Sequence, residues 1–157
     1  MSIFPPIEEL LPHRGNMLLL SRVLAADDES AACEAVPDAD AWYADADGLM
    51  PAWIGIELMA QTIAAHVALI ARRAGKPPRP GVLLGTRAYR AGVERFAAGK
   101  PLEVMARVTY RDDSGLGAYD CAMVDGNGTE LATAAITVYE PADFAKFIDG
   151  QTHGEAQ

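Results

Sequence analysis

One acidic residue lies inside the most apolar stretch of this sequence. Glu57 falls within residues 52–71, most of which are Ala, Ile, Leu, Met or Val, and Gln61 follows it four residues later. Residues four apart lie on the same face of a helix. A carboxyl group in apolar surroundings holds its proton more tightly, which suits a general acid near neutral pH. We therefore predict that Glu57 is catalytic and that Gln61 contacts the substrate; the alternative is a Glu57 that points outward or pairs with an arginine.

Three histidines are available as a general base. His66 is nine residues after Glu57, which places it on the opposite face of a helix, so we interpret it as a packing or interface residue. His153 lies in a polar tail and carries little weight. His13 lies in a loop that precedes an apolar segment. This position makes His13 the candidate base, with a loop-stabilising histidine as the alternative.

The residues before Glu57 predict the start of a helix. Pro51 suits a first turn, where backbone N–H groups are free and carry partial positive charge. We expect the N–H of Ala52 or Trp53 to polarise a substrate carbonyl group, the alternative being an ordinary helix start. Gly55 is unfavourable inside a helix, so its presence indicates close packing of a neighbouring helix or ligand.

The elements that must hold these residues form a simple pattern. A short helix is predicted at 7–11 and a long one from Pro51 to about Arg73. Strand-like segments flank the long helix at 17–26, 30–36, 81–96, 102–112, 116–124 and 129–139. The pattern predicts an α+β fold in which an antiparallel sheet wraps one buried helix. Because such a sheet covers only part of a helix that is apolar all round, we expect a second subunit to cover the rest.

Length and charge limit the class of protein. The 157 residues fit one domain, predicted over residues 1–140, followed by a tail at 141–157. The 22 acidic residues outnumber the 13 basic ones, which argues against a nucleic-acid partner. Polar residues within 52–71 disfavour a membrane span, and no basic segment followed by an apolar one begins the chain. We predict a cytoplasmic protein that needs neither a metal ion nor a cofactor.

Two regions resemble a known family. They are Leu11-Pro12-His13-Arg14 with the following residues 17–23, and Met50-Pro51 with Glu57-Leu58-Met59-Ala60-Gln61. Both are similar to the 3-hydroxyacyl-ACP dehydratases of fatty-acid synthesis, and in particular to the dehydratase-like subunits of aryl-polyene pigment clusters. The resemblance implies a hot-dog fold, dimers with shared active sites, and elimination of water from a 3-hydroxyacyl thioester.

The sequence departs from that family at one catalytic position. The family has a catalytic histidine 14 positions before its helical acid, where this chain has Tyr43. A tyrosine is a poor base at neutral pH. Either His13 takes over, or a partner subunit supplies the base, or the chain is a non-catalytic hot-dog subunit that supports a catalytic paralogue. A hot-dog thioesterase, whose helical carboxylate activates water, is a further alternative.

Basic residues gather in one segment of this acidic chain. Eight of the 13 lie between residues 72 and 100, where Glu94 is the single acid. Acyl carrier proteins are acidic, so a basic surface would steer one toward this chain, although a solvated face is the simpler interpretation. We predict carrier-protein docking by Arg72, Arg73, Lys76 and Arg79, in a homodimer or in a heterodimer with a hot-dog paralogue.

Overall fold

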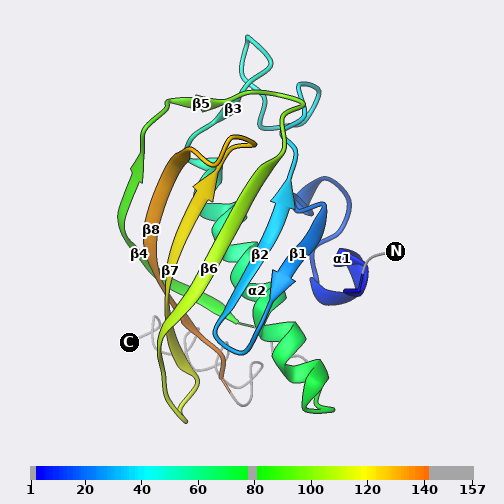
Figure 1. The fold of residues 1–157 in the computed structure, drawn as a ribbon, viewed down its shortest axis with the longest axis vertical. Helices are drawn as coiled ribbons and strands as arrows, with labels where there is room; N and C mark the ends of the chain where they lie inside the picture. The colour runs from blue at the N-terminus through cyan, green and yellow to red at the C-terminus, as the bar shows by residue number, and fades with distance from the viewer. Residues whose placement is uncertain (1–2, 78–80, 142–157) are drawn as a thin grey trace, which may run out of the picture.

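A six-stranded antiparallel sheet and one long helix form the main part of the fold (Figure 1). The computed structural model describes residues 3–77 and 81–141. In order across the main sheet, the strands are β1 (Arg22–Ala26), β2 (Ser30–Ala35), β6 (Leu102–Arg111), β7 (Leu116–Val124), β8 (Glu130–Tyr139) and β4 (Val82–Ala91). All neighbours pair antiparallel, as the sequence predicted.

The long helix α2 (Ile54–Arg73) runs along one face of the sheet, whose strands curve around it (Figure 1). Along β6, the side chains of Leu102, Val104 and Ala106 are buried and alternate with more exposed residues. This period of two places one face of the sheet against α2 and the other toward solvent. The predicted sheet wrapped around a helix is therefore confirmed.

Helix α2 is long and apolar enough to cross a membrane by length and composition alone. In the fold, however, 61% of its most apolar window is buried, and it packs mainly against the strands of the sheet. The apolar surface of the helix is thus used mainly for packing inside the domain. This agrees with the interpretation of residues 52–71 as a core helix.

The start of α2 differs from the prediction. The helix begins at Ile54, not at Pro51, because Met50 and Pro51 form the short strand β3, which pairs with β5 (Arg95–Phe96). For the same reason the segment predicted as one strand over 81–96 is divided into β4 and β5. Residues 52 and 53 form the turn between β3 and α2.

The N-terminal region, which contains His13, lies across α2. Helix α1 (Ile7–Leu10) packs against α2. The strand predicted over 17–26 begins only at Arg22, because the 3-10 helix η1 (Gly15–Met17) and the irregular residues 18–21 precede it. Buried leucines at 10, 11 and 20 anchor this region to the core. The loop between α1 and β1 is therefore held over the first turns of the long helix.

Candidate active site

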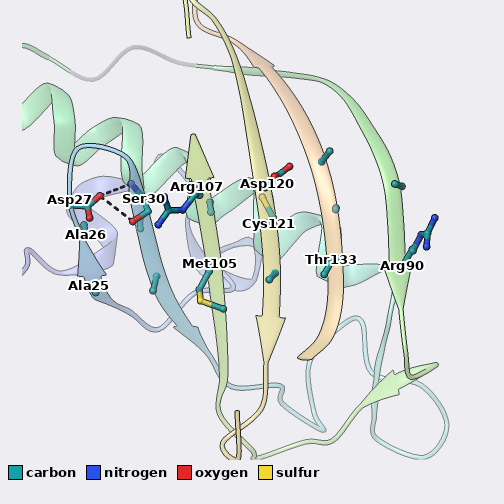
Figure 2. A pocket seen from close by; sticks show the side chains of 17 residues that line it. Ala25, Ala26, Asp27, Ser30, Arg90, Met105, Arg107, Asp120, Cys121 and Thr133 are labelled. Atoms are coloured by element: carbon teal, nitrogen blue, oxygen red, sulfur yellow. Dashed lines mark hydrogen bonds between the residues drawn. The ribbon is translucent and has the colours of Figure 1, made fainter. Parts of the chain in front are cut away.

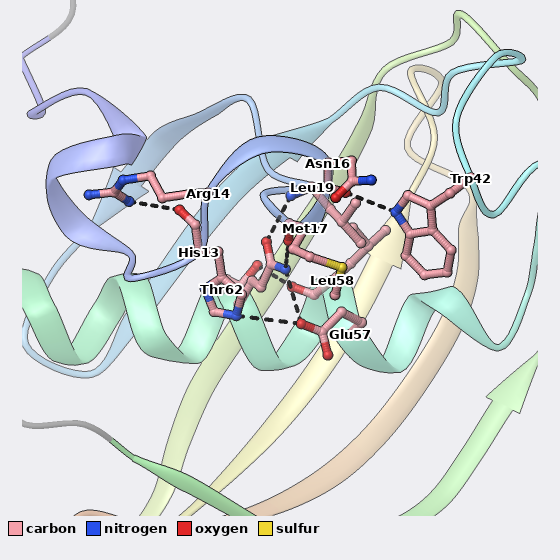
Figure 3. Close-up of polar contacts among 10 residues, drawn as sticks. His13, Arg14, Asn16, Met17, Leu19, Trp42, Glu57, Leu58 and Thr62 are labelled. Carbon is pink, nitrogen blue, oxygen red and sulfur yellow. Dashed lines mark hydrogen bonds and ion pairs between the residues drawn. The ribbon is translucent and has the colours of Figure 1, made fainter.

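The structure brings together the two residues predicted to act as acid and base. Nε2 of His13 lies 3.6 Å from Oε1 of Glu57 (Figure 3), although 44 positions separate them in the chain. The side chain of His13 is 27% exposed and that of Glu57 is 40% exposed. The carboxylate is thus accessible in the single chain, and the deep burial expected from the apolar sequence around it is not present.

His13 and Glu57 lie close together but are not hydrogen-bonded to each other. A separation of 3.6 Å is too long for a direct hydrogen bond. Nδ1 of His13 is buried and has no hydrogen-bond partner within the described part of the chain. The loop between α1 and β1, residues 11–21, carries His13 and is called the histidine loop below. It is fixed through Arg14, which donates to the backbone carbonyl groups of Leu11 and His13 at 2.6 and 2.7 Å. Both side chains can therefore bind a substrate hydroxyl group or a water molecule that lies beside the pair.

Gln61 holds the histidine loop against the helix. Its side chain is fully buried, and its amide nitrogen donates to the Met17 carbonyl at 2.8 Å and to Glu57 Oε1 at 3.0 Å. Its amide oxygen accepts from the backbone N–H of Leu19 at 3.0 Å. Both ends of the amide are thus engaged within the protein. The prediction that Gln61 contacts the substrate is wrong for this structure, because its polar atoms position the loop and the Glu57 carboxylate.

The two backbone groups proposed to polarise a carbonyl have different surroundings. The N–H of Ala52 donates to the carbonyl of Glu94 at 2.9 Å, in continuation of the β3–β5 pairing. It is therefore not free, and Ala52 was wrongly predicted as a donor to the substrate. The N–H of Trp53 has no hydrogen-bond partner among residues 3–77 and 81–141. Trp53 also precedes Glu57 by four residues and so lies on the same face of the helix.

Tyr43 stands at the position where the family resemblance implies a catalytic histidine. Its side chain is buried in the core, and its hydroxyl accepts a hydrogen bond from the backbone N–H of Asp38 at 2.9 Å. The ring of Trp42 packs edge-on against it, and Trp42 Nε1 donates to the Asn16 carbonyl at 2.8 Å. Tyr43 therefore stabilises the loop before α2, and its hydroxyl is already committed.

His66 belongs to a buried network on the other face of the helix. Its Nε2 lies 2.9 Å from the Asp27 carbonyl and its Nδ1 lies 3.2 Å from the Tyr119 hydroxyl, which accepts from Arg111 at 2.8 Å. These partners suit a neutral imidazole that donates from Nε2 and accepts at Nδ1. Burial lowers the pKa of His66, which favours the same neutral form. The interpretation of His66 as a packing residue agrees with this geometry.

Neither cysteine offers a nucleophile. Cys33 and Cys121 are both buried, and burial raises the pKa of each thiol to about 12. The thiolate is the reactive form of cysteine, and thiols with so high a pKa do not populate it near neutral pH. Covalent catalysis by a cysteine is therefore not part of what this site can do.

The predicted docking residues lie at the opposite end of α2. Arg72 pairs with Glu9 at 3.3 Å and Arg73 pairs with Asp28 at 3.2 Å, all on the surface. At a rise of 1.5 Å per residue, Arg72 is about 22 Å from Glu57 along the helix axis. Arg79 lies outside the described residues. Two of the four predicted docking residues are thus partly neutralised by carboxylates, which the charge count along the sequence did not show.

A hollow of about 730 Å³ lies apart from these residues, on the outer face of the sheet (Figure 2). Small side chains such as Ala32, Ala122 and Thr133 form its floor, with Arg107 and Asp120 among its polar residues. Along β7 and β8, Asp120, Ala122 and Thr133 alternate with the buried residues that face α2. The hollow contains no histidine and receives no side chain from α2. It is therefore separate from the Glu57 and His13 pair.

Comparisons with known proteins point to a dehydratase family. The ApeP-like family, described as ApeP dehydratase, matches residues 5–149. Among solved structures, the dehydratase heterocomplex ApeI:P from Xenorhabdus doucetiae is similar with 27% identity and a TM-score of 0.86, over 93% of this chain and 97% of the other. No curated protein sequence matches the chain.

More distant structures share the fold alone. The PaaI protein from the phenylacetic acid degradation operon of Escherichia coli has 14% identity and a TM-score of 0.58, over 76% of this chain and 82% of that one. A hypothetical thioesterase from Streptococcus pneumoniae, solved with coenzyme A, has 11% identity and a TM-score of 0.61, over 76% and 84%. The fold is thus the hot-dog fold that the family resemblance implied.

Proposed function

This chain belongs to the ApeP-like dehydratase family, and from that premise we propose how its own residues remove water from a 3-hydroxyacyl thioester in aryl-polyene biosynthesis. The observation that carries the proposal is the distance of 3.6 Å between His13 Nε2 and Glu57 Oε1. An elimination needs a base at the α carbon and an acid at the leaving hydroxyl. His13 and Glu57 offer these two groups within reach of one small substrate.

In the reaction we propose, neutral His13 takes the proton from the α carbon of the substrate. The electron pair of that C–H bond forms the new double bond, while protonated Glu57 donates its proton to the departing hydroxyl, which leaves as water. The Trp53 N–H binds the thioester carbonyl oxygen, on which negative charge develops. After turnover the proton on His13 can pass to the Glu57 carboxylate beside it, which restores both groups.

We further propose that the chain works with a second hot-dog subunit. The similar structure from Xenorhabdus doucetiae is named as a heterocomplex. In this chain β4 is an edge strand, and it exposes Leu83 and Leu84 by 45% and 52%. Trp53, at the site itself, is 61% exposed. A paralogous subunit that paired with β4 would cover these side chains and enclose Glu57.

The proposed substrate is carried by an acidic acyl carrier protein, in the cytoplasm. Arg72, Arg73 and Lys76 stand at the end of α2 remote from Glu57, where they would receive the carrier by charge attraction. Because Glu9 and Asp28 pair with the two arginines, the attraction would be modest and sensitive to salt. Carrier binding should therefore weaken as ionic strength rises.

One observation favours a second function, that of a non-catalytic subunit. Tyr43 replaces the expected catalytic histidine, and its hydroxyl is bound to the Asp38 N–H. In that case this chain would shape the site of a catalytic paralogue and would carry no turnover of its own. The two functions differ in whether Glu57 and His13 of this chain are needed.

The deciding experiment compares variants of this chain alone and in complex with its paralogue. Glu57→Gln and His13→Ala are each expected to reduce conversion of a carrier-bound 3-hydroxyacyl thioester to the enoyl thioester by about 100-fold or more. Glu130→Gln, at an exposed strand end, is the matched control and should keep full activity. Full activity of both site variants in the complex would favour the non-catalytic subunit. Release of a free acid would instead indicate a thioesterase.

A further inference from the structure

Tyr89, which the sequence did not single out, reaches the start of α2 from strand β4. The pairing of β4 with β8 shifts between Arg87 and Arg90, and Ala88 within this bulge has a φ of 52°. Bulges redirect side chains, and a positive φ is unusual for a residue other than glycine. The half-buried Tyr89 hydroxyl donates to the carbonyl of Ala52. The irregular strand thus aims Tyr89 at the turn that leads into the helix.

Gly55 makes room for this contact. A Cβ atom at position 55 would overlap the Tyr89 hydroxyl and would lie 3.1 Å from the sulfur of Met123. Glycine inside a helix costs about 1 kcal/mol relative to alanine. The neighbour that the sequence implied at Gly55 is therefore Tyr89, and two locally unfavourable features, the glycine and the bulge, meet at one hydroxyl group.

The carbonyl bound by Tyr89 belongs to the same peptide group as the Trp53 N–H. In a trans peptide the C=O and N–H bonds point in opposite directions and lie in one plane. The Ala52 carbonyl accepts from the Tyr89 hydroxyl and also from the Gly55 N–H at 3.0 Å. Two donors on the oxygen fix the orientation of this plane. They also draw electron density from the nitrogen, which makes the Trp53 N–H a better donor.

We propose that Tyr89 is a positioning residue, whose hydroxyl orients and polarises the Ala52–Trp53 peptide group so that the Trp53 N–H binds the thioester carbonyl oxygen. The inference rests on the proposed function. Tyr89 approaches the helix beside Gly55, which is two residues from Glu57 and so faces the other way. It therefore acts through the peptide group without touching the substrate. Burial raises the pKa of Tyr89, so its hydroxyl stays protonated and remains a donor near neutral pH.

The test removes the hydroxyl and keeps the ring. In Tyr89→Phe we expect kcat to fall about tenfold with little change in KM, because the bond to the carbonyl oxygen strengthens as charge develops in the transition state. Tyr110→Phe is the matched control, since the Tyr110 hydroxyl binds exposed Asp112 far from the site. Gly55→Ala, which pushes the hydroxyl aside, should reproduce the effect, and the double variant should be no worse than Gly55→Ala alone.

A spectroscopic measurement separates this role from simple packing. The chain has two tryptophans, so backbone ¹⁵N labelling of tryptophan gives two amide resonances, assigned with Trp42→Phe. Tyr89→Phe should move the Trp53 amide proton upfield and leave that of Trp42 in place. An unmoved Trp53 amide would overturn the proposal, even if the rate and stability fell. If the unmodified protein were inactive alone and in complex, the proposed function would fail, while the amide shift would still test the link between Tyr89 and Trp53.

Discussion

Replacing Gln61 with methionine tests how the site is held together. Methionine fills a similar volume but cannot make the three hydrogen bonds of the glutamine amide. The change should release the loop that carries His13 from α2 while it leaves Glu57 and His13 themselves unaltered. Stability and activity should therefore fall together.

The size of the effect follows from the groups that lose their partners. The Met17 carbonyl and the Leu19 N–H lie in a partly buried region and would each lose a hydrogen bond of about 1 kcal/mol, with a further penalty where water cannot replace it. The bond to Glu57 adds little, because the 40% exposed carboxylate can bind water instead. We expect Gln61→Met to lower the free energy of unfolding by about 2–4 kcal/mol, and to lower kcat/KM about tenfold or more.

Urea denaturation at neutral pH measures the change in stability, and the dehydration assay measures the change in rate. Thr62→Val is the control, since the buried Thr62 hydroxyl donates to Leu58 within its own helix at 2.9 Å and holds no loop. It should cost less than about 1 kcal/mol. A loss below about 1 kcal/mol in Gln61→Met, with an unchanged rate, would refute the assignment of Gln61 as the anchor of the histidine loop.

Two further predictions concern residues outside the pair. Tyr43→Phe should lower the free energy of unfolding by about 1 kcal/mol, through loss of the bond to the Asp38 N–H, and should leave kcat unchanged; a large loss of kcat without loss of stability would instead give Tyr43 a part in the reaction. Burial lowers the pKa of His66 in the fold, so the unfolded chain binds a proton at this residue more readily than the folded chain does. The contribution of neutral His66 to the free energy of unfolding is therefore complete above about pH 6.5 and is lost as the pH falls below it. Urea denaturation at about pH 7.5 and about pH 5.5 should therefore show a smaller loss of stability in His66→Gln than in the unaltered protein. Equal losses in the two proteins would count against a buried, neutral His66.

Much of the fold could be read from periodicity in the sequence. The alternation along Leu102 to Thr109 reflects a strand with one buried face, and the apolar surface of residues 54–73 reflects a helix inside a sheet. Both patterns are local consequences of burial. The start of the helix could not be predicted in this way, because Pro51 is also compatible with a strand end and its pairing with Arg95 depends on a segment 44 residues away.

The surroundings of the site residues could not be predicted either. Glu57 and Gln61 were identified because they are polar residues in an apolar stretch. Gln61 nevertheless binds the backbone of the loop at Met17 and Leu19. The basic segment contains Arg72 and Arg73, whose partners Glu9 and Asp28 lie far away in the sequence. Charge counted along a chain does not include the opposite charges that folding brings beside it.

By itself, the sequence determined the antiparallel sheet around one long helix, the position of Glu57 on that helix, and the choice of His13 as the candidate base. These follow from local spacing and residue type. Only the tertiary structure decided that His13 lies 3.6 Å from Glu57, that the Ala52 N–H is occupied, and that Tyr89 meets Gly55. Each of these depends on packing between segments distant in the chain, and side-chain distances of that kind are set by the whole core and not by any one segment.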